Sequence, residues 1–268
     1  MSTATAPSET AAPAIADIGY GRVFADFYDR LFPQDGAADR TAAALAGWHP
    51  GGSALELGVG TGRIAIPLAR LTGEVVGVDS SPEMLERLRT AVEESGVPVT
   101  PVHGDIRTYD DGDRHGLVYC VCGTMSLVLD PEGQRAAVAG AARRLAPGGT
   151  LEVETHNPGF VHTLHEGLSR TSFFAPYPEP GTGLQTYSTL LAEQGLWHTS
   201  HLLHEPGGTR IGTEITRLTT PEDIEAYAAE AGLERVSLHG DWSGGPFVAT
   251  QSPVHISRFV RAGRTEQS

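Results

Sequence analysis

The sequence predicts an α/β fold: a doubly wound, mostly parallel sheet of seven strands with an antiparallel β insertion late in the chain. Between residues 36 and 157, short apolar runs alternate with helix-like segments of roughly ten to fifteen residues, a pattern typical of parallel pairing. One strand-to-helix junction, ALELGVGTGRIA at residues 54–65, holds three closely spaced glycines. After residue 160, turn signals separate strand-like runs without intervening helices, which indicates an antiparallel meander.

Composition narrows the class of protein. The 268-residue chain is 40% apolar and 19% charged, as in a soluble globular protein. We expect a disordered tail over residues 1–18, rich in Ala, Thr, Ser and Pro, one domain over residues 19–262, and a cytoplasmic location. The net charge of −14 disfavours nucleic acid as a partner, and no apolar run approaches the roughly 20 residues of a membrane span. All 19 basic residues are arginines, which excludes lysine-dependent mechanisms.

Two helices precede the sheet. Residues 20–32, YGRVFADFYDRLF, place Phe24, Phe27 and Tyr28 at helical spacing, which predicts one amphipathic helix. The Ala-rich segment that begins at Gly36 predicts a second helix, which ends at Gly47.

Five strands of the sheet follow in order. The strand-like runs are SALELG, EVVGVD, VPVTPVHGD, LVYCVCG and TLEVETHN. The fourth run is continuously apolar, as in a strand that is buried on both faces. The intervening helices run over residues 62–71 with an irregularity at Pro67, from the cap Ser81 to Gly96, and from the cap Asp130 to the turn at 147–149. In the first of these helices, Ile64, Leu68 and Leu71 are expected to share one apolar face.

The only cysteines, Cys120 and Cys122, fall in the fourth predicted strand. Positions i and i+2 of a strand share one face, so the two residues are interpreted as small buried side chains. A disulfide framework, a metal site or a redox pair is disfavoured.

The insertion is predicted between about residues 160 and 220, with strands LQTYSTLLA, LWHTSHLLHE and TRIGTEITRLT. The chain then returns to the sheet with a helix, PEDIEAYAAEAG, and two strands, LERVSLHGDW and HISRFVRA. In this architecture an insertion can cover the carboxyl ends of the parallel strands, where ligands bind.

The glycine-rich junction indicates the kind of ligand. Gly58, Gly60 and Gly62 form G-x-G-x-G rather than the dinucleotide fingerprint G-x-G-x-x-G. Glu56 lies in the strand just before them. A carboxylate there disfavours a pyrophosphate and favours a ligand that carries ammonium and sulfonium groups.

Acids also end the next two strands. Asp79 ends the second strand, where a carboxylate suits the two hydroxyls of a ribose. Asp105 ends the third, where it can accept a hydrogen bond from an adenine amino group. The ordered set of strand-end acids therefore indicates an adenosine-containing cation.

These motifs resemble those of the class I S-adenosylmethionine-dependent methyltransferases. LELGVGTGR is similar to their first motif, VVGVDSSPEML to their second, HGDI to their third, and PGGTLEVE to the turn and fifth strand that follow. The resemblance covers about residues 20–260 and implies a Rossmann-like fold, transferase activity and S-adenosylmethionine as cofactor. The cofactor-binding residues that it implies are Tyr20, Tyr28, Glu56, Gly58, Gly60, Gly62, Arg63, Asp79, Ser80, Met84, Gly104, Asp105, Ile106 and Cys120.

The same resemblance implies roles for these residues. The three glycines line the methionyl part, and Asp79 holds the ribose hydroxyls. Met84 packs on the adenine face, and Asp105 with Ile106 binds the adenine edge. The carbonyl of Cys120 lies near the methionine ammonium.

YDRLF near the N-terminus and VETHNP after the fifth strand are similar to small-molecule methyltransferases of bacterial secondary metabolism, sugar N-methyltransferases included. In such enzymes a tyrosine of the N-terminal helix covers the methyl donor. That role falls to Tyr28, or to Tyr20 if the helix is shifted, and a core aromatic is the alternative for Tyr28. The chain departs from the pattern at His115-Gly116, where an aspartate is usual. Its loop GTMSL also lacks the Asn-Pro-Pro-Tyr of many nucleic acid or glutamine methyltransferases.

His156 is the candidate catalytic base, because it ends the fifth strand and histidine titrates near neutral pH. Glu154 shares its face two residues earlier. The alternative is that His156 only shapes the pocket or caps the next turn.

The sequence does not assign a single role to several other polar and aromatic residues. His198 and His204 share a strand face while His201 points the other way, so ordinary strand residues are favoured over a metal cluster, and one of the three could reach the pocket. We expect metal-independent transfer. Trp197 and Trp242 are interpreted as pocket walls or core residues.

The sequence therefore predicts methyl transfer to a small-molecule natural-product intermediate, at nitrogen or an electron-rich carbon, with an amine, amino sugar or indole as acceptor. An O-methyltransferase is the nearest alternative. A nicotinamide-dependent oxidoreductase and a non-catalytic S-adenosylmethionine-binding protein are further alternatives. The edge of the meander would allow a homodimer.

Overall fold

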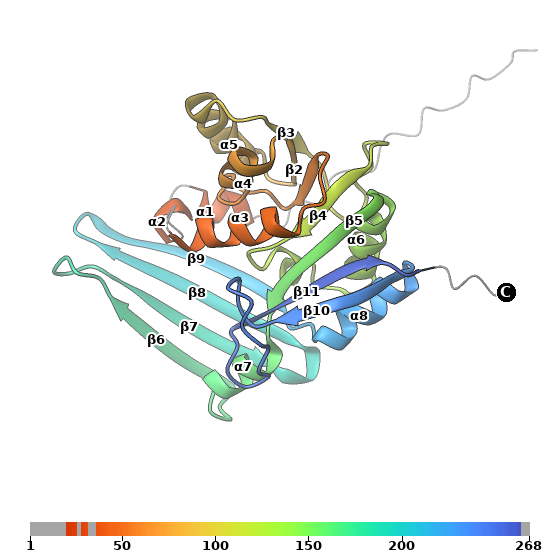
Figure 1. Ribbon diagram of the computed structural model, residues 1–268. Helices are drawn as coiled ribbons and strands as arrows, with labels where there is room; N and C mark the ends of the chain where they lie inside the picture. Colours follow the sequence, from red (N-terminus) through yellow and green to blue (C-terminus); the bar gives the residue numbers. More distant parts are fainter. Residues whose placement is uncertain (1–19, 26–27, 32–35, 264–268) are drawn as a thin grey trace, which may run out of the picture.

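The computed structural model describes residues 20–25, 28–31 and 36–263 and confirms the α/β architecture (Figure 1). The strands of the main sheet are β1 (Ala54–Leu57), β2 (Val75–Asp79), β3 (Val99–His103), β4 (His115–Cys120), β5 (Leu145–His156), β10 (Leu233–His239) and β11 (Val254–Arg261). Their order is β10-β11-β5-β4-β1-β2-β3. β1 to β5 run parallel, and β11 pairs antiparallel with β5 and β10. The loops that follow β1 to β5 therefore meet at one edge of the sheet.

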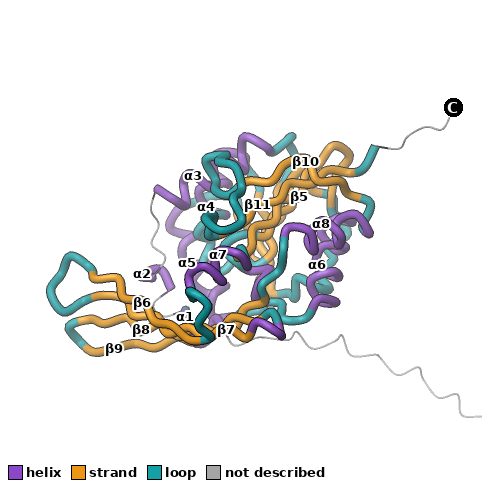
Figure 2. The backbone as a smooth tube through the Cα atoms, turned by 90° about the horizontal axis from the view of Figure 1, so that it is seen from below, coloured by secondary structure: helices purple, strands orange, loops and turns teal. Residues whose placement is uncertain are grey.

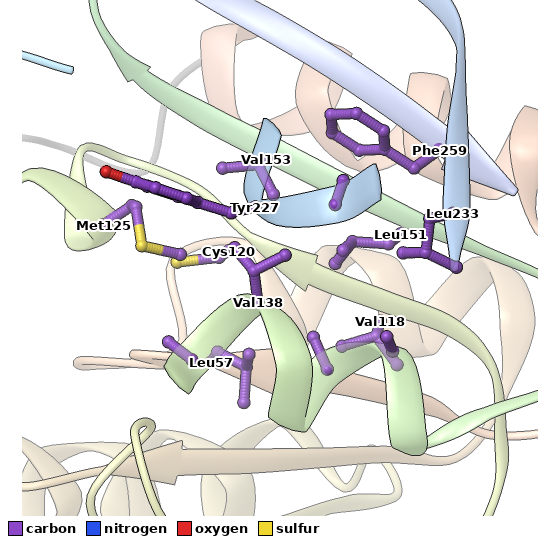
Figure 3. Close-up of a cluster of buried hydrophobic side chains, with 14 of the residues drawn as sticks. Leu57, Val118, Cys120, Met125, Val138, Leu151, Val153, Tyr227, Leu233 and Phe259 are labelled. Carbon is purple, nitrogen blue, oxygen red and sulfur yellow. The ribbon is translucent and has the colours of Figure 1, made fainter. Parts of the chain in front are cut away.

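Helices cover both faces of this sheet. Helices α3 (Gly36–Trp48), α4 (Ala65–Thr72) and α5 (Pro82–Ser95) pack on one face, and α6 (Pro131–Arg143) and α8 (Pro221–Glu230) pack on the other. Side chains of β4 alternate between the two cores: Leu117 and Tyr119 join the first, and Val118 and Cys120 the second. Figure 3 shows the second core. All six residues of β4 are buried, as its apolar run predicts.

The predicted helix caps of α5 and α6 are confirmed. The side chain of Ser81 accepts a hydrogen bond from the amide of Met84, and Gly96 ends α5 in the left-handed conformation at φ +66°. Asp130 caps α6 in the same way by accepting from Gly133 N–H at 2.6 Å. These local signals fix where α5 and α6 begin, beside the carboxyl edge of the sheet.

The insertion forms a separate antiparallel sheet of four strands. They are β6 (Arg170–Pro176), β7 (Gly183–Leu191), β8 (Leu196–Glu205) and β9 (Gly208–Arg217), in that order. Figure 2 shows this sheet extending from one side of the molecule. The sequence analysis missed β6 and the short helix α7 (Pro158–Leu164) that precedes it. The register pairs Thr186 with His201 and His201 with Gly212, so these residues share one face.

The N-terminal region differs from the prediction of one helix over residues 20–32. The structure has two short helices, α1 (Tyr20–Phe24) and α2 (Tyr28–Leu31). Phe27 and the predicted tail over residues 1–18 lie outside the described residues. α1 contacts both α5 and β9, and Arg30 of α2 forms an ion pair with Glu205 of β8. The N-terminal helices therefore connect the main sheet to the insertion (Figure 1).

Two expectations for the helix after β1 are wrong. Leu71 is 58% exposed, because the buried face of α4 is formed by Ala65, Leu68 and Ala69. Pro67 causes no interruption, since α4 begins at Ala65. Proline in the first turn removes only an amide that has no partner within the helix.

The ends of β4 and β5 also differ from the prediction. β4 ends at Cys120, and Cys122 follows in a turn at φ +56°, so the two cysteines do not share a strand face. Cys120 is buried and Cys122 is exposed. The turn at 147–149 does not end a helix: α6 ends at Arg143, and the turn lies within β5, where the register with β4 shifts.

Candidate active site

A cavity of about 310 Å³ opens at the carboxyl edge of the main sheet. Its lining comes from α1 and α2, from the loops after β1, β2, β3 and β4, from the end of β5, and from β9. The main sheet thus builds one side of the cavity, the insertion builds the other, and the N-terminal helices lie between them. Cavities of this size and composition are typical of small-molecule sites.

The glycine loop after β1 needs its glycines for different reasons. Gly58, Gly60 and Gly62 have φ of +83°, +55° and +86°, where any side chain is strained. A Cβ on Gly58 would lie 2.6 Å from Oγ1 of Thr124, and one on Gly62 would overlap Leu88 of α5. A Cβ on Gly60 would meet nothing within 4 Å. Gly58 and Gly60 both line the cavity, but only at Gly60 is the space beside the backbone open to a ligand.

Asp79 holds this loop against the start of α5. Its Oδ2 accepts from Gly60 N–H at 2.8 Å, and its Oδ1 accepts from Ser81 N–H at 2.9 Å. A carboxylate can accept about four hydrogen bonds, so these two are compatible with the predicted contact to a ribose diol. Asp79 and Ser80 both line the cavity.

Glu56 is an acid beneath the glycine loop and is only 2% exposed. Tyr119 donates a hydrogen bond to its Oε2 at 2.9 Å, and Ala65 N–H also donates to the carboxylate. Burial raises the pKa of Glu56 to about 8, and the nearby charge of Asp79 adds to the rise. The group therefore holds a proton near neutral pH until a cation in the cavity stabilises the carboxylate.

Asp105 is bound by its own neighbour. The guanidinium of Arg107 contacts both carboxylate oxygens, at 2.5 to 3.0 Å, and Arg107 N–H donates to Oδ1 at 2.9 Å. Burial alone would raise the pKa of Asp105, but these bonds lower it. Asp105, Ile106 and Met84 line the same cavity, so the predicted contact of Asp105 with an adenine amino group would share the carboxylate with Arg107.

The loop after β4 is held by an acid of β5. Glu154 accepts hydrogen bonds from the backbone amides of Cys122 and Gly123 and from the indole Nε1 of Trp242. Its side chain therefore fixes the turn rather than sharing the cavity with His156. Arg63 lines the cavity, and its guanidinium approaches Sγ of Cys122 at 3.8 Å.

Tyr20 and Tyr28 both line the cavity, with ring centroids 6.4 Å apart in an edge-on arrangement. Tyr20 also stacks on Phe24 at 4.5 Å. Burial and the charge of Glu214 raise the pKa of Tyr20, which keeps the phenol neutral. Tyr20 and Tyr28 thus form the part of the cavity wall that the N-terminal helices contribute.

The insertion side of the cavity carries an acid and lies next to His156. Glu214 and Thr216 of β9 line the cavity together with His156 at the end of β5. Burial lowers the pKa of His156, against the opposing effect of Glu214, so its imidazole is neutral near pH 7. The ring of Trp197 packs edge-on against that imidazole at 5.4 Å. A neutral imidazole in this position can accept a proton.

The structure brings most predicted site residues to one cavity. Those that line it are Tyr20, Tyr28, Glu56, Gly58, Gly60, Arg63, Asp79, Ser80, Met84, Asp105, Ile106 and His156. Gly62, Gly104 and Cys120 do not line it: Gly62 packs on α5, Gly104 lies beside Val78 and Tyr109, and the side chain of Cys120 is buried in the core.

Four further residues that line the cavity were not predicted from the sequence: Arg107, Cys122 and, on the insertion, Glu214 and Thr216. The alternation in GTEIT places Glu214 and Thr216 on one face of β9, but the sequence does not indicate that this face covers the cavity. Within the described ranges, no group of three or more His, Cys, Asp or Glu side chains is arranged to hold a metal ion. Among the described helices, none has the length and apolarity that crossing a membrane requires.

Comparisons with known proteins agree with this geometry. A family model described as a methyltransferase domain matches residues 54–149. The dTDP-4-amino-2,3,4,6-tetradeoxy-D-glucose N,N-dimethyltransferase of Saccharopolyspora spinosa is 28% identical over 204 residues, 75% of this chain and 79% of that protein. The phosphatidylethanolamine N-methyltransferase of Cereibacter sphaeroides is 34% identical over 162 residues, 59% of this chain and 72% of that protein. The solved structure of the CcbJ methyltransferase from Streptomyces caelestis has a TM-score of 0.77 and 31% identity, over 86% of this chain and 96% of that chain.

Proposed function

Because this chain belongs to the S-adenosylmethionine-dependent methyltransferases, we propose that it methylates an amine nitrogen of a small-molecule natural-product intermediate. The family, the enzyme class and the cofactor that the motifs predict are confirmed by the matching family model and by the relatives. The acceptor atom, the acceptor class and the roles of individual residues are the subject of the proposal.

The main-sheet side of the cavity fits the cofactor. Gly60 leaves an open space where a Cβ would stand, and Glu56 is a buried carboxyl whose charge a ligand ammonium would stabilise. Asp79 would hold the ribose, and Ile106 and Met84 would pack on the adenine. When bound, S-adenosylmethionine supplies a methyl group on a sulfonium, which is already activated for displacement.

The observation that carries the choice of an amine is the pair of His156 and Glu214 in one cavity: a neutral imidazole beside a carboxylate. An amine that enters protonated must lose one proton before its lone pair can attack a methyl carbon. His156 can accept that proton, and Glu214 can stabilise the positive charge that returns to nitrogen as the new N–C bond forms. The two relatives named above are both N-methyltransferases, which supports the same choice.

Cofactor binding is tested by thermal unfolding with S-adenosylhomocysteine, S-adenosylmethionine or NAD. We expect the two sulfur ligands to raise the melting temperature and NAD to leave it unchanged. In Asp79→Ala the shift should be lost, each variant being compared with itself without ligand because Asp79 also supports the fold. A shift with NAD alone would contradict the proposed function.

The acceptor atom is tested with matched pairs of compounds that carry either an amine or a hydroxyl at the same position. The pairs are aminodeoxy sugar nucleotides and amino-terminal peptides, each with its hydroxyl counterpart. Simple indoles are tested beside them, and S-adenosylhomocysteine release is the measurement. Turnover of the amine member alone supports the proposal. Turnover of hydroxyl members alone would identify an O-methyltransferase instead.

A further inference from the structure

Glu214 is the carboxylate that the insertion contributes to the cavity within the described residues. It lies on β9, and its strand neighbour Thr216 lines the same cavity. No backbone turn or helix cap accounts for a carboxylate at this position. Its presence therefore requires a separate explanation.

The other charged carboxylates of the cavity already have structural partners. Asp79 holds the amides of the glycine loop and of α5, as described above. Asp105 is bound by Arg107 in a two-point ion pair. Asp130 caps α6. Glu214 differs from these three acids, because its hydrogen bonds among the described residues are made within the insertion and not to a loop or helix end of the main sheet.

Side chains of β8 hold Glu214 in place. Thr199 donates a hydrogen bond to Oε1 of Glu214 at 3.1 Å, and Nε2 of His201 lies 3.1 Å from the same oxygen. Thr186 of β7 hydrogen-bonds to Nδ1 of His201 at 3.1 Å, so both ring nitrogens of His201 have partners. Among the described residues, both hydrogen bonds to the carboxylate fall on Oε1, which leaves Oε2 as the oxygen for a ligand.

The carboxylate is ionised although it is largely buried. Its side chain is 16% exposed. Burial alone would raise the pKa of Glu214, but the hydrogen bond and charge of His201, with smaller effects of His156 and Thr199, lower it. Among the described residues, Glu214 forms an ion pair with His201 at Oε1 and none with an arginine, so an ammonium group at Oε2 would be a second cationic partner.

We infer that Glu214 is the binding residue for the ammonium group of the acceptor, and that the acceptor is an aliphatic amine that enters the site protonated. This inference rests on the proposed function. Aliphatic amines resemble the lysine side chain, with a pKa of about 10.4, and are cationic at neutral pH. Indoles, aromatic amines and alcohols carry no charge there and would bring no cation to Oε2 of Glu214.

The test uses the full chain saturated with S-adenosylhomocysteine and two small probes, n-butylammonium and n-butanol. Binding is followed by the backbone amide shifts of β8 and β9 in two-dimensional NMR spectra. In the wild type we expect the ammonium to bind about tenfold more tightly than the alcohol. Glu214→Gln should remove this preference. Glu193→Gln should keep it, because this substitution removes the same charge at an exposed position of the insertion.

The possible results distinguish failure of the inference about Glu214 from failure of the proposed function. Equal binding of the two probes, no binding of the ammonium, or a preference that survives in Glu214→Gln would overturn the inference. Failure of the wild type to bind S-adenosylhomocysteine would instead overturn the proposed function. With an amine acceptor from the activity screen, Glu214→Gln should raise KM about tenfold or more while S-adenosylhomocysteine affinity stays unchanged.

Discussion

The main-sheet side and the insertion side of the cavity are built by different means. On the main-sheet side, each acid accepts at least one hydrogen bond from a backbone amide: Gly60 and Ser81 donate to Asp79, Ala65 to Glu56, and Arg107 to Asp105. The side chains of Tyr119 and Arg107 add to these backbone contacts. On the insertion side, Glu214 is held by two side chains, Thr199 and His201. A site built from backbone geometry tolerates few substitutions. A site built from side chains can change its residues without altering the strands that carry them. The difference suits a protein that keeps one cofactor and adapts its acceptor.

The largest effect is expected from Gly58→Ala, which acts on the backbone of the main-sheet side. The new Cβ would sit at a φ of +83° and 2.6 Å from Oγ1 of Thr124. Strain and overpacking together should cost about 3 kcal/mol of the free energy of unfolding, roughly 6 to 12 °C in the melting temperature. Thermal unfolding without ligand measures it.

Gly60→Ala is the control for this substitution. Its φ of +55° also disfavours a side chain, but a Cβ there would meet nothing within 4 Å. We expect the free energy of unfolding to fall by about 1 kcal/mol. The free energy of S-adenosylhomocysteine binding should weaken by more than that. Equal destabilisation by both variants would show that packing against Thr124 contributes nothing.

The second prediction concerns the pH dependence that Glu56 confers on the same side. Its pKa in the folded protein is about 8, above the ordinary glutamate value of 4.5. The folded protein therefore keeps a proton that the unfolded chain releases, and stability falls as pH rises from about 4.5 to 8. A ligand ammonium favours the carboxylate, so binding should release a proton and strengthen with pH in this range.

Calorimetric titration with S-adenosylhomocysteine between about pH 6 and 8 measures this effect. Affinity should rise by up to about tenfold per pH unit and level off above pH 8. In Glu56→Gln the pH dependence should disappear, because the amide does not titrate. A wild-type affinity that is flat with pH would mean that no ligand cation is bound near Glu56.

The same contrast explains what the sequence could predict. The glycine loop, Asp79 and the caps Ser81 and Asp130 are local signals, because each acts within a few residues of the chain. Their elements and most of the residues that line the main-sheet side of the cavity were therefore predictable. Gly62 has the same glycine pattern as Gly60, and only the packing of Leu88 separates their roles.

The insertion could be predicted as a meander but not as a site. The position of Glu214 over the cavity depends on the register of β8 with β9 and on contacts of β9 with α1. The local sequence determines neither this register nor these contacts. β6 was missed because RTSFFAP, which ends in proline, lacks the polar and apolar alternation of a half-buried strand. Cys122 was misplaced because the turn after β4 depends on Glu154, which is distant in the chain.

The smallest effect is expected from Thr199→Val, which acts on the insertion side alone. Valine keeps the shape of this buried side chain and removes the hydrogen bond to Glu214. A hydrogen bond to a charged group contributes about 1.5 to 3 kcal/mol, but His201 still holds the carboxylate. We therefore expect KM for an amine acceptor to rise only about fivefold, with kcat and S-adenosylhomocysteine affinity unchanged.

Thr213→Val is the matched control, since Thr213 lies on the opposite face of β9 and bonds to Ser200 rather than to Glu214. It should leave KM unchanged. If the two variants behave alike, the network behind Glu214 does not position it, and the acceptor side would be as dependent on backbone geometry as the cofactor side. If only Thr199→Val raises KM, the two sides of the cavity are separable, and acceptor preference can change through β8 and β9 without loss of the cofactor.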